Sequence, residues 1–288
     1  MSEQPRTGRP FRSGFATVVG RPNVGKSTLV NALLGRKVSI VSDKVNTTRQ
    51  ALRGILHLPD AQVVFVDTPG LHKPRTLLGT RLNERAADAL EGVDVALLVL
   101  DANAEIGRGD AFIASRLPTD SICVVNKVDR VDRSTLAAQL ARAGVLGLGE
   151  YFPVSAVTGE GLAALTAAVV ARLSPGPPYY PTEVVRDSPE AAFLAELVRE
   201  RLLDRLEDEL PHAVATRVTE WDWPRVRVEI LVERDSQKGI VIGRGGSVLR
   251  AVGAAVREEF DPGMYLELFV KVDRDWQRRA EALDRLGL

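Results

Sequence analysis

The sequence predicts a mostly parallel, doubly wound α/β domain followed by a smaller α+β domain. Apolar, strand-like runs alternate with helical stretches from residue 14 to residue 173, a pattern typical of a parallel sheet with helices on both faces. The stretch Ser174–Pro181 then places four prolines and a glycine in eight residues, so it cannot sustain a helix or a strand. We therefore expect a loose tail at 1–13, an α/β domain at 14–173, a semi-rigid linker at 174–182 and a second domain at 183–288.

The composition limits the class of protein. A length of 288 residues fits two domains, and 45% apolar residues are ordinary for globular proteins. Lys+Arg and Asp+Glu both number 38, so any nucleic-acid surface must be a local patch. The single Cys123 excludes a disulfide framework, and its apolar neighbours predict a buried strand position. With no apolar run of about 18 residues and no secretory signal, we expect a cytoplasmic protein.

The stretch Gly20–Ser27 lies between a predicted buried strand at 15–19 and a predicted helix at 28–34. Strand, glycine-bounded loop, Lys-Ser and helix together form the phosphate-binding P-loop. Its backbone N–H groups converge on one centre, and the start of the helix adds a positive dipole. Lys26 can reach the β- and γ-phosphates, and the Ser27 hydroxyl can bind Mg²⁺. The residues expected to contact the nucleotide here are Asn23, Val24, Gly25, Lys26, Ser27 and Thr28.

A second motif, Asp67-Thr68-Pro69-Gly70, follows the apolar run at 62–66. An acidic residue at the carboxyl end of such a strand lies where open α/β sheets bind ligands, so Asp67 is the predicted second Mg²⁺ anchor. Thr68 and Pro69 complete the turn, and the Gly70 N–H is expected to face the γ-phosphate. The polar stretch at 43–50 predicts a mobile loop. Its spacing leaves Thr47 and Thr48 open as Mg²⁺ ligand, and we assign Thr48.

A third motif selects the base. Asn126-Lys127-Val128-Asp129 follows a predicted strand at 121–125. The Asp129 carboxylate can accept two hydrogen bonds from the N1–H and 2-amino group of guanine, whereas adenine would leave it unpaired. The Lys127 stem can lie over the base. The backbone of Ser155 and Ala156, after a short strand at 151–154, is placed to approach guanine O6. These residues predict a guanine nucleotide.

The second domain carries Gly243-Arg244-Gly245-Gly246 at the entrance of a predicted helix. The elements predicted around this loop are a helix at 190–210 that Pro211 stops, strands at 214–219 and 225–233, a polar turn at 234–239, a helix to about 260, a strand at 265–272 and a helix at 276–286. This order is that of a KH domain of the type II kind. In such a domain the Gly-X-X-Gly loop lets an RNA backbone come close.

Charge in the second domain is concentrated around this loop. Residues 183–288 contain 17 Lys+Arg against 22 Asp+Glu, a net of −5, which is unlike a general nucleic-acid binder. From Glu233 to Arg257, however, basic residues outnumber acidic ones, as phosphate contact requires. The residues expected to contact RNA are Lys238, Ile242, Gly243, Arg244, Gly245, Gly246 and Arg250. A structural αβ domain without RNA binding is the alternative.

The nucleotide motifs, in this order, match those of the translation-factor class of small GTPases. With Val241–Gly246 in a carboxyl-terminal KH-like domain, the chain resembles the Era family of bacterial GTPases from about residue 14 onward. The resemblance implies a P-loop fold, hydrolysis of GTP to GDP and phosphate with Mg²⁺, binding near the 3′ end of 16S ribosomal RNA and a role in 30S subunit maturation. It also implies peripheral association with the inner face of the cell membrane, and we expect a monomer.

Two positions bear on hydrolysis. Leu71 stands where Ras-like enzymes carry a glutamine that orients the attacking water, so we expect slow intrinsic hydrolysis. Lys26, Thr48 and Gly70 are then the predicted catalytic groups. Asn23 resembles the asparagine that binds an activating K⁺ in some relatives, and a plain polar loop residue is the alternative.

Three other functions compete with a GTPase. An RNA-binding scaffold could use GTP or GDP only as a structural ligand, but the intact set of Lys26, Ser27 and Asp67 argues against it. An ATP-dependent kinase conflicts with the motif at 126–129, and a double GTPase of the Der family would need a second P-loop.

Overall fold

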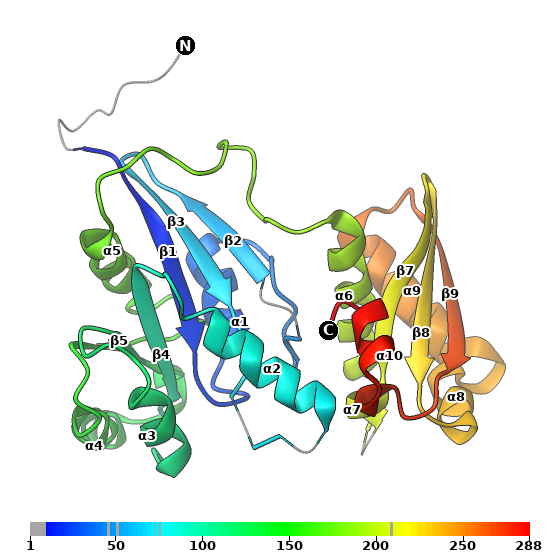
Figure 1. Ribbon diagram of the computed structural model, residues 1–288, viewed down its shortest axis with the longest axis horizontal. Helices are drawn as coiled ribbons and strands as arrows, with labels where there is room; N and C mark the ends of the chain where they lie inside the picture. Colours follow the sequence, from blue (N-terminus) through cyan, green and yellow to red (C-terminus); the bar gives the residue numbers. More distant parts are fainter. Residues whose placement is uncertain (1–9, 45–46, 50–51, 72, 75, 208–209) are drawn as a thin grey trace. The chain divides into compact units, whose positions relative to one another are not determined.

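The computed structural model describes all residues except 1–9, 45–46, 50–51, 72, 75 and 208–209 (Figure 1). The chain forms two compact units. The first comprises Met1–Ser39, Thr48–Lys73 and Leu82–Asp187, and the second comprises Ile40–Thr47, Pro74–Arg81 and Ser188–Leu288. The second unit therefore takes in two segments from the first third of the chain. Most of the predicted tail lies outside the described residues, and the first strand already begins at Arg12.

The first unit contains a six-stranded sheet in the order β2-β3-β1-β4-β5-β6. Among its described strands only the β2–β3 pair is antiparallel, so the predicted mostly parallel sheet is confirmed. The elements are β1 Arg12–Val19, α1 Lys26–Leu34, β2 Leu52–His57, β3 Ala61–Asp67, α2 Leu77–Asp88, β4 Val95–Asp101, α3 Arg108–Ala114, β5 Ile122–Asn126, a 3₁₀ turn Val128–Arg130, α4 Arg133–Gly144, β6 Glu150–Pro153 and α5 Leu162–Arg172.

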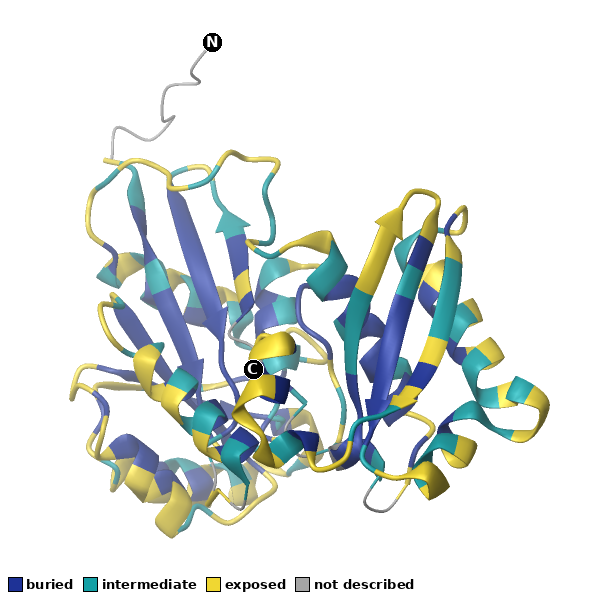
Figure 2. Cartoon of the chain, turned by 45° about the vertical axis from the view of Figure 1, so that its right-hand side comes forward, coloured by how far each residue is buried: buried dark blue, intermediate teal, exposed yellow. Residues whose placement is uncertain are grey.

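The central strands are buried on both faces, which is why their sequences are apolar without alternation (Figure 2). Val18 and Leu97 belong to a cluster with α1 and α5 residues such as Leu29 and Leu165. The alternate strand positions, among them Cys123, pack in a second cluster on the other face. The parallel strands end at one edge of the sheet, so the loops after β1, β3 and β5 meet there.

The proline-rich stretch is held along the first unit. The Gln62 side-chain oxygen accepts hydrogen bonds from the backbone N–H groups of Tyr179 (2.7 Å) and Tyr180 (3.0 Å). Further along, the Ile55 N–H donates to the carbonyl of Val185 at 3.0 Å. The residues just after the stretch therefore cover part of the free edge of β2, which would otherwise offer unpaired backbone groups.

The second unit contains a three-stranded sheet in the order β7-β8-β9, with β7–β8 antiparallel and β8–β9 parallel. The inward positions of β8, among them Val226, Val228 and Ile230, are fully buried against α6 and α9. This is the predicted smaller α+β domain. Its elements are α6 Glu190–Leu203, α7 Leu210–Ala213, β7 Ala215–Asp222, β8 Arg225–Val232, α8 Asp235–Ile242, a 3₁₀ turn Arg244–Gly246, α9 Ser247–Phe260, β9 Tyr265–Val272, a 3₁₀ turn Trp276–Arg278 and α10 Ala280–Arg285.

The predicted bounds of two elements of this unit were wrong. The helix predicted to Leu210 ends at Leu203, and Pro211 lies in the first turn of α7, where proline is tolerated, instead of stopping α6. The polar stretch predicted as a turn at 234–239 begins α8. There the Gln237 side-chain oxygen accepts hydrogen bonds from the N–H groups of Glu233 (2.9 Å) and Arg234 (3.0 Å), so the side chain satisfies donors at the start of the helix.

One stretch, 235–260, has the length and apolar composition of a membrane-spanning helix. In the structure it is two helices, α8 and α9, because Gly243 and Gly245 adopt φ values of 74° and 56° between them. Val241 and Val252 of these helices have no exposed surface and pack in the core of the second unit. These two valines thus belong to a folded core, whereas Ile240 of the same stretch is exposed.

Candidate nucleotide and nucleic-acid sites

The loop between β1 and α1 packs tightly on the neighbouring strand ends. Gly25, immediately before α1, has φ 94°, a left-handed conformation that favours glycine. A Cβ atom on Gly25 would lie 2.4 Å from the Asn126 side-chain nitrogen. The loop can therefore approach the end of β5 only because no side chain intervenes.

Lys26 is the first residue of α1, and it is 6% exposed. Its ammonium group donates hydrogen bonds to the carbonyl oxygens of Gly20 (3.1 Å) and Arg21 (3.0 Å). Burial lowers the pKa of Lys26 to about 8, and the neighbouring Asp67 carboxylate opposes part of this shift. The loop thus surrounds a buried cation, which is the arrangement that an incoming phosphate requires.

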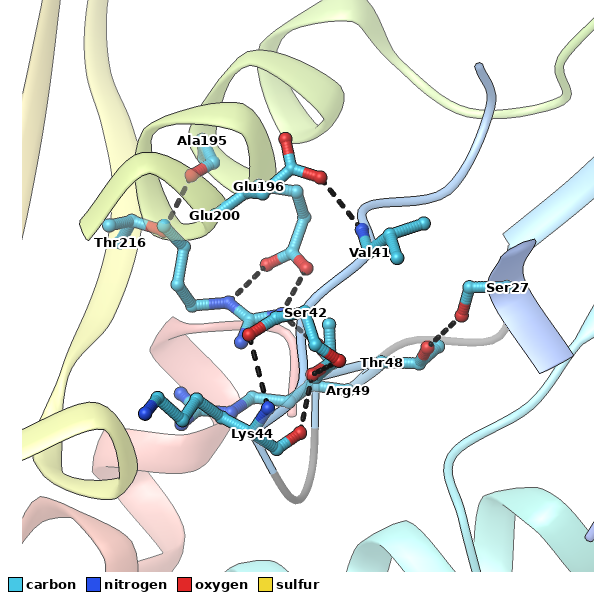
Figure 3. Close-up of polar contacts among 12 residues, drawn as sticks. Ser27, Val41, Ser42, Lys44, Thr48, Arg49, Ala195, Glu196, Glu200 and Thr216 are labelled. Carbon is cyan, nitrogen blue, oxygen red and sulfur yellow. Dashed lines mark hydrogen bonds and ion pairs between the residues drawn. The ribbon is translucent and has the colours of Figure 1, made fainter. Parts of the chain in front are cut away.

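Three side-chain oxygens meet beside Lys26. The Ser27 and Thr48 hydroxyls lie 2.9 Å apart (Figure 3), and the Thr48 hydroxyl donates to the Asp67 carboxylate at 3.3 Å. Thr47 instead donates to the carbonyl of Lys44 in its own loop at 2.6 Å. Of the two threonines, the structure thus brings Thr48 together with Ser27 and Asp67.

These oxygens fit a magnesium ion. Asp67 has no exposed surface, and its Oδ1 atom has no hydrogen-bond partner among the described residues. Burial raises the pKa of Asp67, while a hydrogen bond from Ser27 and the charge of Lys26 oppose the shift. A carboxylate and two hydroxyls are the hard oxygen donors that Mg²⁺ prefers, and a cation would pair with the unsatisfied Oδ1.

The base-recognition motif is joined to the P-loop by hydrogen bonds. Asn126 donates from its side-chain nitrogen to the carbonyl of Val24 (3.0 Å) and accepts at its side-chain oxygen from the N–H of Ala156 (3.1 Å). Lys127 has φ 68°, and its ammonium donates to the carbonyl of Asn23 at 2.6 Å. The structure therefore brings together three segments that the sequence predicted to meet.

The Asp129 side chain is oriented by a hydrogen bond to one of its two carboxylate oxygens. The Ser155 hydroxyl donates to Asp129 Oδ1 at 2.6 Å, and the residue is otherwise exposed. This bond orients the carboxylate at the site where guanine is expected. Ser155 thus contributes its side chain as well as the predicted backbone.

The segment after β3 contacts the P-loop through its backbone. A Cβ atom on Gly70 would lie 2.9 Å from the backbone of Pro22, so Gly70 is placed by close approach. Leu71 packs against the core cluster on that face, and its N–H donates to the carbonyl of Gly20 at 3.3 Å. Thr68 is buried and donates to the carbonyl of Val18 at 2.8 Å, so its hydroxyl serves the fold. Pro69 lies beside it in the same turn.

The loop between α8 and α9 is exposed and rich in unusual backbone angles. Gly243 has φ 74° and ψ 167°, and a Cβ atom there would lie 2.6 Å from Val248 Cγ2. Gly246, just before α9, has φ 78°. Arg244 is exposed, whereas the Arg250 guanidinium donates to the carbonyl of Gly245 and braces the loop.

Comparison with known proteins identifies a family for each part of the chain. Residues 15–127 match the family model described as 50S ribosome-binding GTPase, and residues 209–277 match the KH domain model. GTPase Era of Mycolicibacterium smegmatis is 46% identical, covering 96% of this chain and 99% of the relative, and GTPase Era of Mycobacterium tuberculosis (strain ATCC 25177 / H37Ra) gives the same values. The chain belongs to the GTPase Era family. The predicted family and its GTPase activity are thereby confirmed.

Two solved Era structures resemble this Era-family chain over nearly its whole length. Era in complex with MgGDPNP and nucleotides 1506–1542 of 16S ribosomal RNA is 34% identical with a TM-score of 0.90, covering 96% of this chain and 99% of the other. A point variant of Aquifex aeolicus Era bound to GDP·AlF4⁻ is 34% identical with a TM-score of 0.91 and the same coverage. The first of these solved relatives holds Mg²⁺ with its nucleotide analogue, in agreement with the oxygen donors described above.

Sequence reasoning missed one residue that contacts the predicted base-recognition motif. The ammonium of Lys127 donates to Asp101 Oδ2 at 2.6 Å, and this ion pair is mostly buried. Asp101 ends the apolar strand β4, just as Asp67 ends β3. The same signal, an acid at the carboxyl end of a buried strand, could therefore have identified it.

Sequence reasoning also missed an aromatic side chain near the KH loop. Phe269 of the edge strand β9 is 56% exposed, and the ammonium of Lys238 lies 5.9 Å from its ring centroid. Ile240 of α8 is likewise 55% exposed, while Ile242 is half-buried against the core. Exposed aromatic rings beside cations are the surfaces on which single-stranded bases stack. Side chains alternate between the two faces of a strand, so a buried Val270 in β9 predicts that Phe269 points outward.

Proposed function

We propose that this Era-family GTPase is a switch that binds RNA near the 3′ end of 16S ribosomal RNA and assists maturation of the small ribosomal subunit. The observation that carries the proposal is the convergence of Ser27, Thr48 and Asp67 beside the buried Lys26 in a chain that also holds an exposed Gly-X-X-Gly loop. A steady-state GTP turnover assay with the same RNA tests it. A chain that binds GTP without turnover would instead be a scaffold with a structural nucleotide.

The residues of the P-loop and its neighbours have separate roles in this proposal. Mg²⁺, held by Ser27, Thr48 and Asp67, would neutralise the charge of the β- and γ-phosphates. The Lys26 ammonium exchanges its bonds to the loop carbonyls for phosphate oxygens. The Gly70 N–H faces the γ-phosphate. The contacts that hold the loop in its curled shape exist within the protein itself, so they need little reorganisation on binding.

We propose slow intrinsic hydrolysis, because the packed, apolar Leu71 cannot orient water. We also propose that a K⁺ ion at Asn23 supplies positive charge that stabilises the transition state of hydrolysis. Asn23 has φ 65°, and its carbonyl is held by Lys127. Turnover should be faster in potassium than in sodium chloride; equal rates would remove K⁺ from the mechanism. Turnover of tens per second without a partner would contradict slow intrinsic hydrolysis.

Asp129 determines base selectivity in this proposal. Asp129→Asn should weaken GTP binding by about 100-fold, because the amide cannot accept both guanine hydrogen bonds, and should favour xanthosine triphosphate. Asp132→Asn is the matched control, since Asp132 is a nearby exposed acid that caps α4. Competition between GTP and xanthosine triphosphate for each variant gives the ratio of the two affinities. Unchanged selectivity in Asp129→Asn would remove the carboxylate from base recognition.

The KH unit is proposed to hold single-stranded RNA at the loop Gly243–Gly246, with Lys238 and Arg244 on the phosphates. Arg250 contributes by bracing the loop. Binding of a labelled oligonucleotide from the 3′ end of 16S ribosomal RNA tests this. If a scrambled double-stranded RNA of equal length bound equally well, the loop would be only a general electrostatic surface.

We also propose that nucleotide state changes RNA affinity. By linkage, RNA must then change the affinity for the GTP analogue by the same factor. Equal RNA affinity with GTP analogue, with GDP and without nucleotide would contradict this.

The cellular setting is proposed on the family resemblance. We propose a monomer in the cytoplasm that associates with the 30S subunit and peripherally with the inner face of the cell membrane. Cell fractionation with and without high salt tests the membrane association. Recovery of the protein only in the soluble fraction at low salt would contradict the membrane part.

A further inference from the structure

The segment Ile40–Thr47 belongs to the second compact unit, although it lies within the predicted nucleotide-binding half of the sequence. Ile40 is 1% exposed, and its side chain is part of the apolar core that includes Leu197 and Val198 of α6. Burial of a whole isoleucine side chain strongly favours association of its segment with that core. The segment is thus anchored on the unit that carries the KH loop.

Two buried ionic side chains of α6 hold the same segment. Glu200 is 3% exposed, and its Oε1 accepts a hydrogen bond from the N–H of Val41 at 2.7 Å (Figure 3). Arg199 is 1% exposed, and its guanidinium donates to the carbonyl of Thr47 and to Glu196. Buried charges are costly unless they are partnered. Here consecutive residues of α6 find partners at the two ends of the segment.

The end held by Arg199 adjoins the magnesium site. Thr47 offers its carbonyl to Arg199, and the next residue, Thr48, places its hydroxyl 2.9 Å from Ser27 and 3.3 Å from Asp67. One peptide unit therefore separates an atom held by α6 from an atom at the proposed Mg²⁺ site. Because a peptide unit is planar and stiff, displacement of the Thr47 carbonyl also reorients Thr48.

The same helix is packed against the helix that follows the KH loop. Val198 of α6 and Val252 and Val256 of α9 have no exposed surface and lie in one core cluster. Well-packed cores transmit displacement because they have few voids to absorb it. A shift of α9 on RNA binding can therefore reach Arg199 through packed side chains.

We propose that Arg199 and Glu200 are positioning residues that set whether Thr48 is presented to magnesium, and so couple RNA at the KH loop to the nucleotide. This inference rests on the proposed function, in which Thr48 is a magnesium ligand and the KH loop binds RNA. Arg199 acts on the Thr47 carbonyl, and Glu200 fixes the other end of the segment at Val41.

The test compares variants of α6 in the full chain. Arg199→Met keeps an unbranched apolar side chain in place of the aliphatic part of arginine and removes the donors to Thr47. Arg201→Met is the matched control, because Arg201 lies on the same helix and pairs with Asp204 and Glu259 within the KH unit. Glu200→Gln keeps an acceptor for the Val41 N–H and should behave as wild type, whereas Glu200→Ala removes it. If Arg199→Met fails to fold, the Glu200 pair decides the same question.

Amide hydrogen exchange of the peptide covering 40–49 is the first measurement. Exchange should accelerate about 10-fold in nucleotide-free Arg199→Met and Glu200→Ala, since the opening of the segment loses a charge-assisted hydrogen bond. It should not change in Arg201→Met or Glu200→Gln. Exchange equal in Arg199→Met and Arg201→Met would overturn the proposal, whether or not the protein hydrolyses GTP.

Nucleotide affinity and turnover measurements test whether Arg199 affects GTP hydrolysis and its coupling to RNA. Arg199→Met should leave GDP affinity within about 2-fold, because the P-loop and base site are intact, and lower kcat for GTP about 10-fold. The ratio of RNA affinities with GTP analogue and with GDP should approach one, while affinity for RNA alone is kept. In a Thr48→Ala background, Arg199→Met should have no further effect on kcat, whereas additive losses would show that Arg199 does not act through Thr48. Absence of turnover in the wild type would overturn the proposed function alone, since the exchange measurement still decides the role of Arg199.

Discussion

The nucleotide site and the KH loop both place glycines before a helix, yet they prepare for their ligands in opposite ways. Before α1, Lys26 and Asp67 are buried, the Lys26 ammonium donates to the carbonyls of Gly20 and Arg21, and the Asp67 carboxylate accepts from Thr48. Before α9, Arg244 and Gly245 are exposed, and the Arg250 side chain braces the loop from outside. The nucleotide phosphates are compact and must be activated, so buried charges act on them most strongly. RNA is an extended polymer and can bind only to an accessible surface. Substitutions should therefore be far more damaging at the first site.

The largest effect is expected from Gly25→Ala. A Cβ atom would collide with Asn126 and require φ 94°, so the bond that joins the P-loop to the base site is lost. We expect GDP affinity to fall at least about 100-fold, as expected when several buried polar contacts are disrupted. Gly35→Ala is the control, since Gly35 also has positive φ but a Cβ there meets nothing within 4 Å. Titration with a fluorescent GDP analogue measures both, and equal affinities would show that the P-loop tolerates displacement.

A smaller effect is expected from Gly243→Ala in the KH unit. Its φ and ψ lie in a region open essentially to glycine alone, and a Cβ atom would meet Val248. RNA affinity should fall about 10-fold with GDP affinity unchanged, because about 1–3 kcal/mol of strain displaces the loop. Gly245→Ala serves as the comparison, since a Cβ there meets open space. Should Gly245→Ala weaken RNA binding more than Gly243→Ala, close approach of the backbone at Gly245 would be the dominant feature of this loop.

Arg244→Ala and Phe269→Ala separate charge from stacking at the KH loop. Each should weaken RNA binding about 5-fold, but only Arg244→Ala should reduce the slope of log affinity against log salt, by about 0.7 for one phosphate on a single strand. The measurement is RNA affinity at several salt concentrations. A reduced slope in Phe269→Ala would contradict a stacking role for the ring.

The smallest effect is a proton taken up on nucleotide binding. Phosphates should restore the lowered pKa of Lys26 toward its ordinary value of 10.5, so GDP binding without Mg²⁺ takes up a fraction of a proton above about pH 8. In the nucleotide-free protein, the folded state binds fewer protons than the unfolded state between about pH 8 and 10.5, so the contribution of Lys26 to stability rises with pH there.

Calorimetry of GDP binding at about pH 8.5 in two buffers with different ionisation enthalpies measures this uptake, because that pH lies just above the lowered pKa of Lys26. The same titrations at about pH 6.5 are the control, because Lys26 is protonated at that pH both with and without nucleotide. Proton release in the more alkaline titration would reverse the assigned sign for Lys26.

Local pattern and topology together predicted that the nucleotide motifs would lie close to one another. The runs ending in Asp67 and Asn126 are apolar because their strands are covered on both faces, and parallel strands end at the same edge. Their motifs therefore had to meet the P-loop. Helix limits were less predictable, because α6 ends at Leu203 and α8 begins at Asp235 through capping and packing that involve residues outside the periodic pattern.

By itself the sequence determined the fold class, the guanine-nucleotide motifs and the Gly-X-X-Gly loop, since each depends on residue type and short spacing. Only the tertiary structure decided which threonine faces Asp67, because adjacent residues of a loop are equivalent until each finds a partner. It also decided that Ile40–Thr47 packs on α6 through Arg199 and Glu200. Those partners lie about 150 residues apart in the sequence. Burial of Ile40 in the core of the second unit brings the segment onto α6, where its backbone groups satisfy the two buried charges.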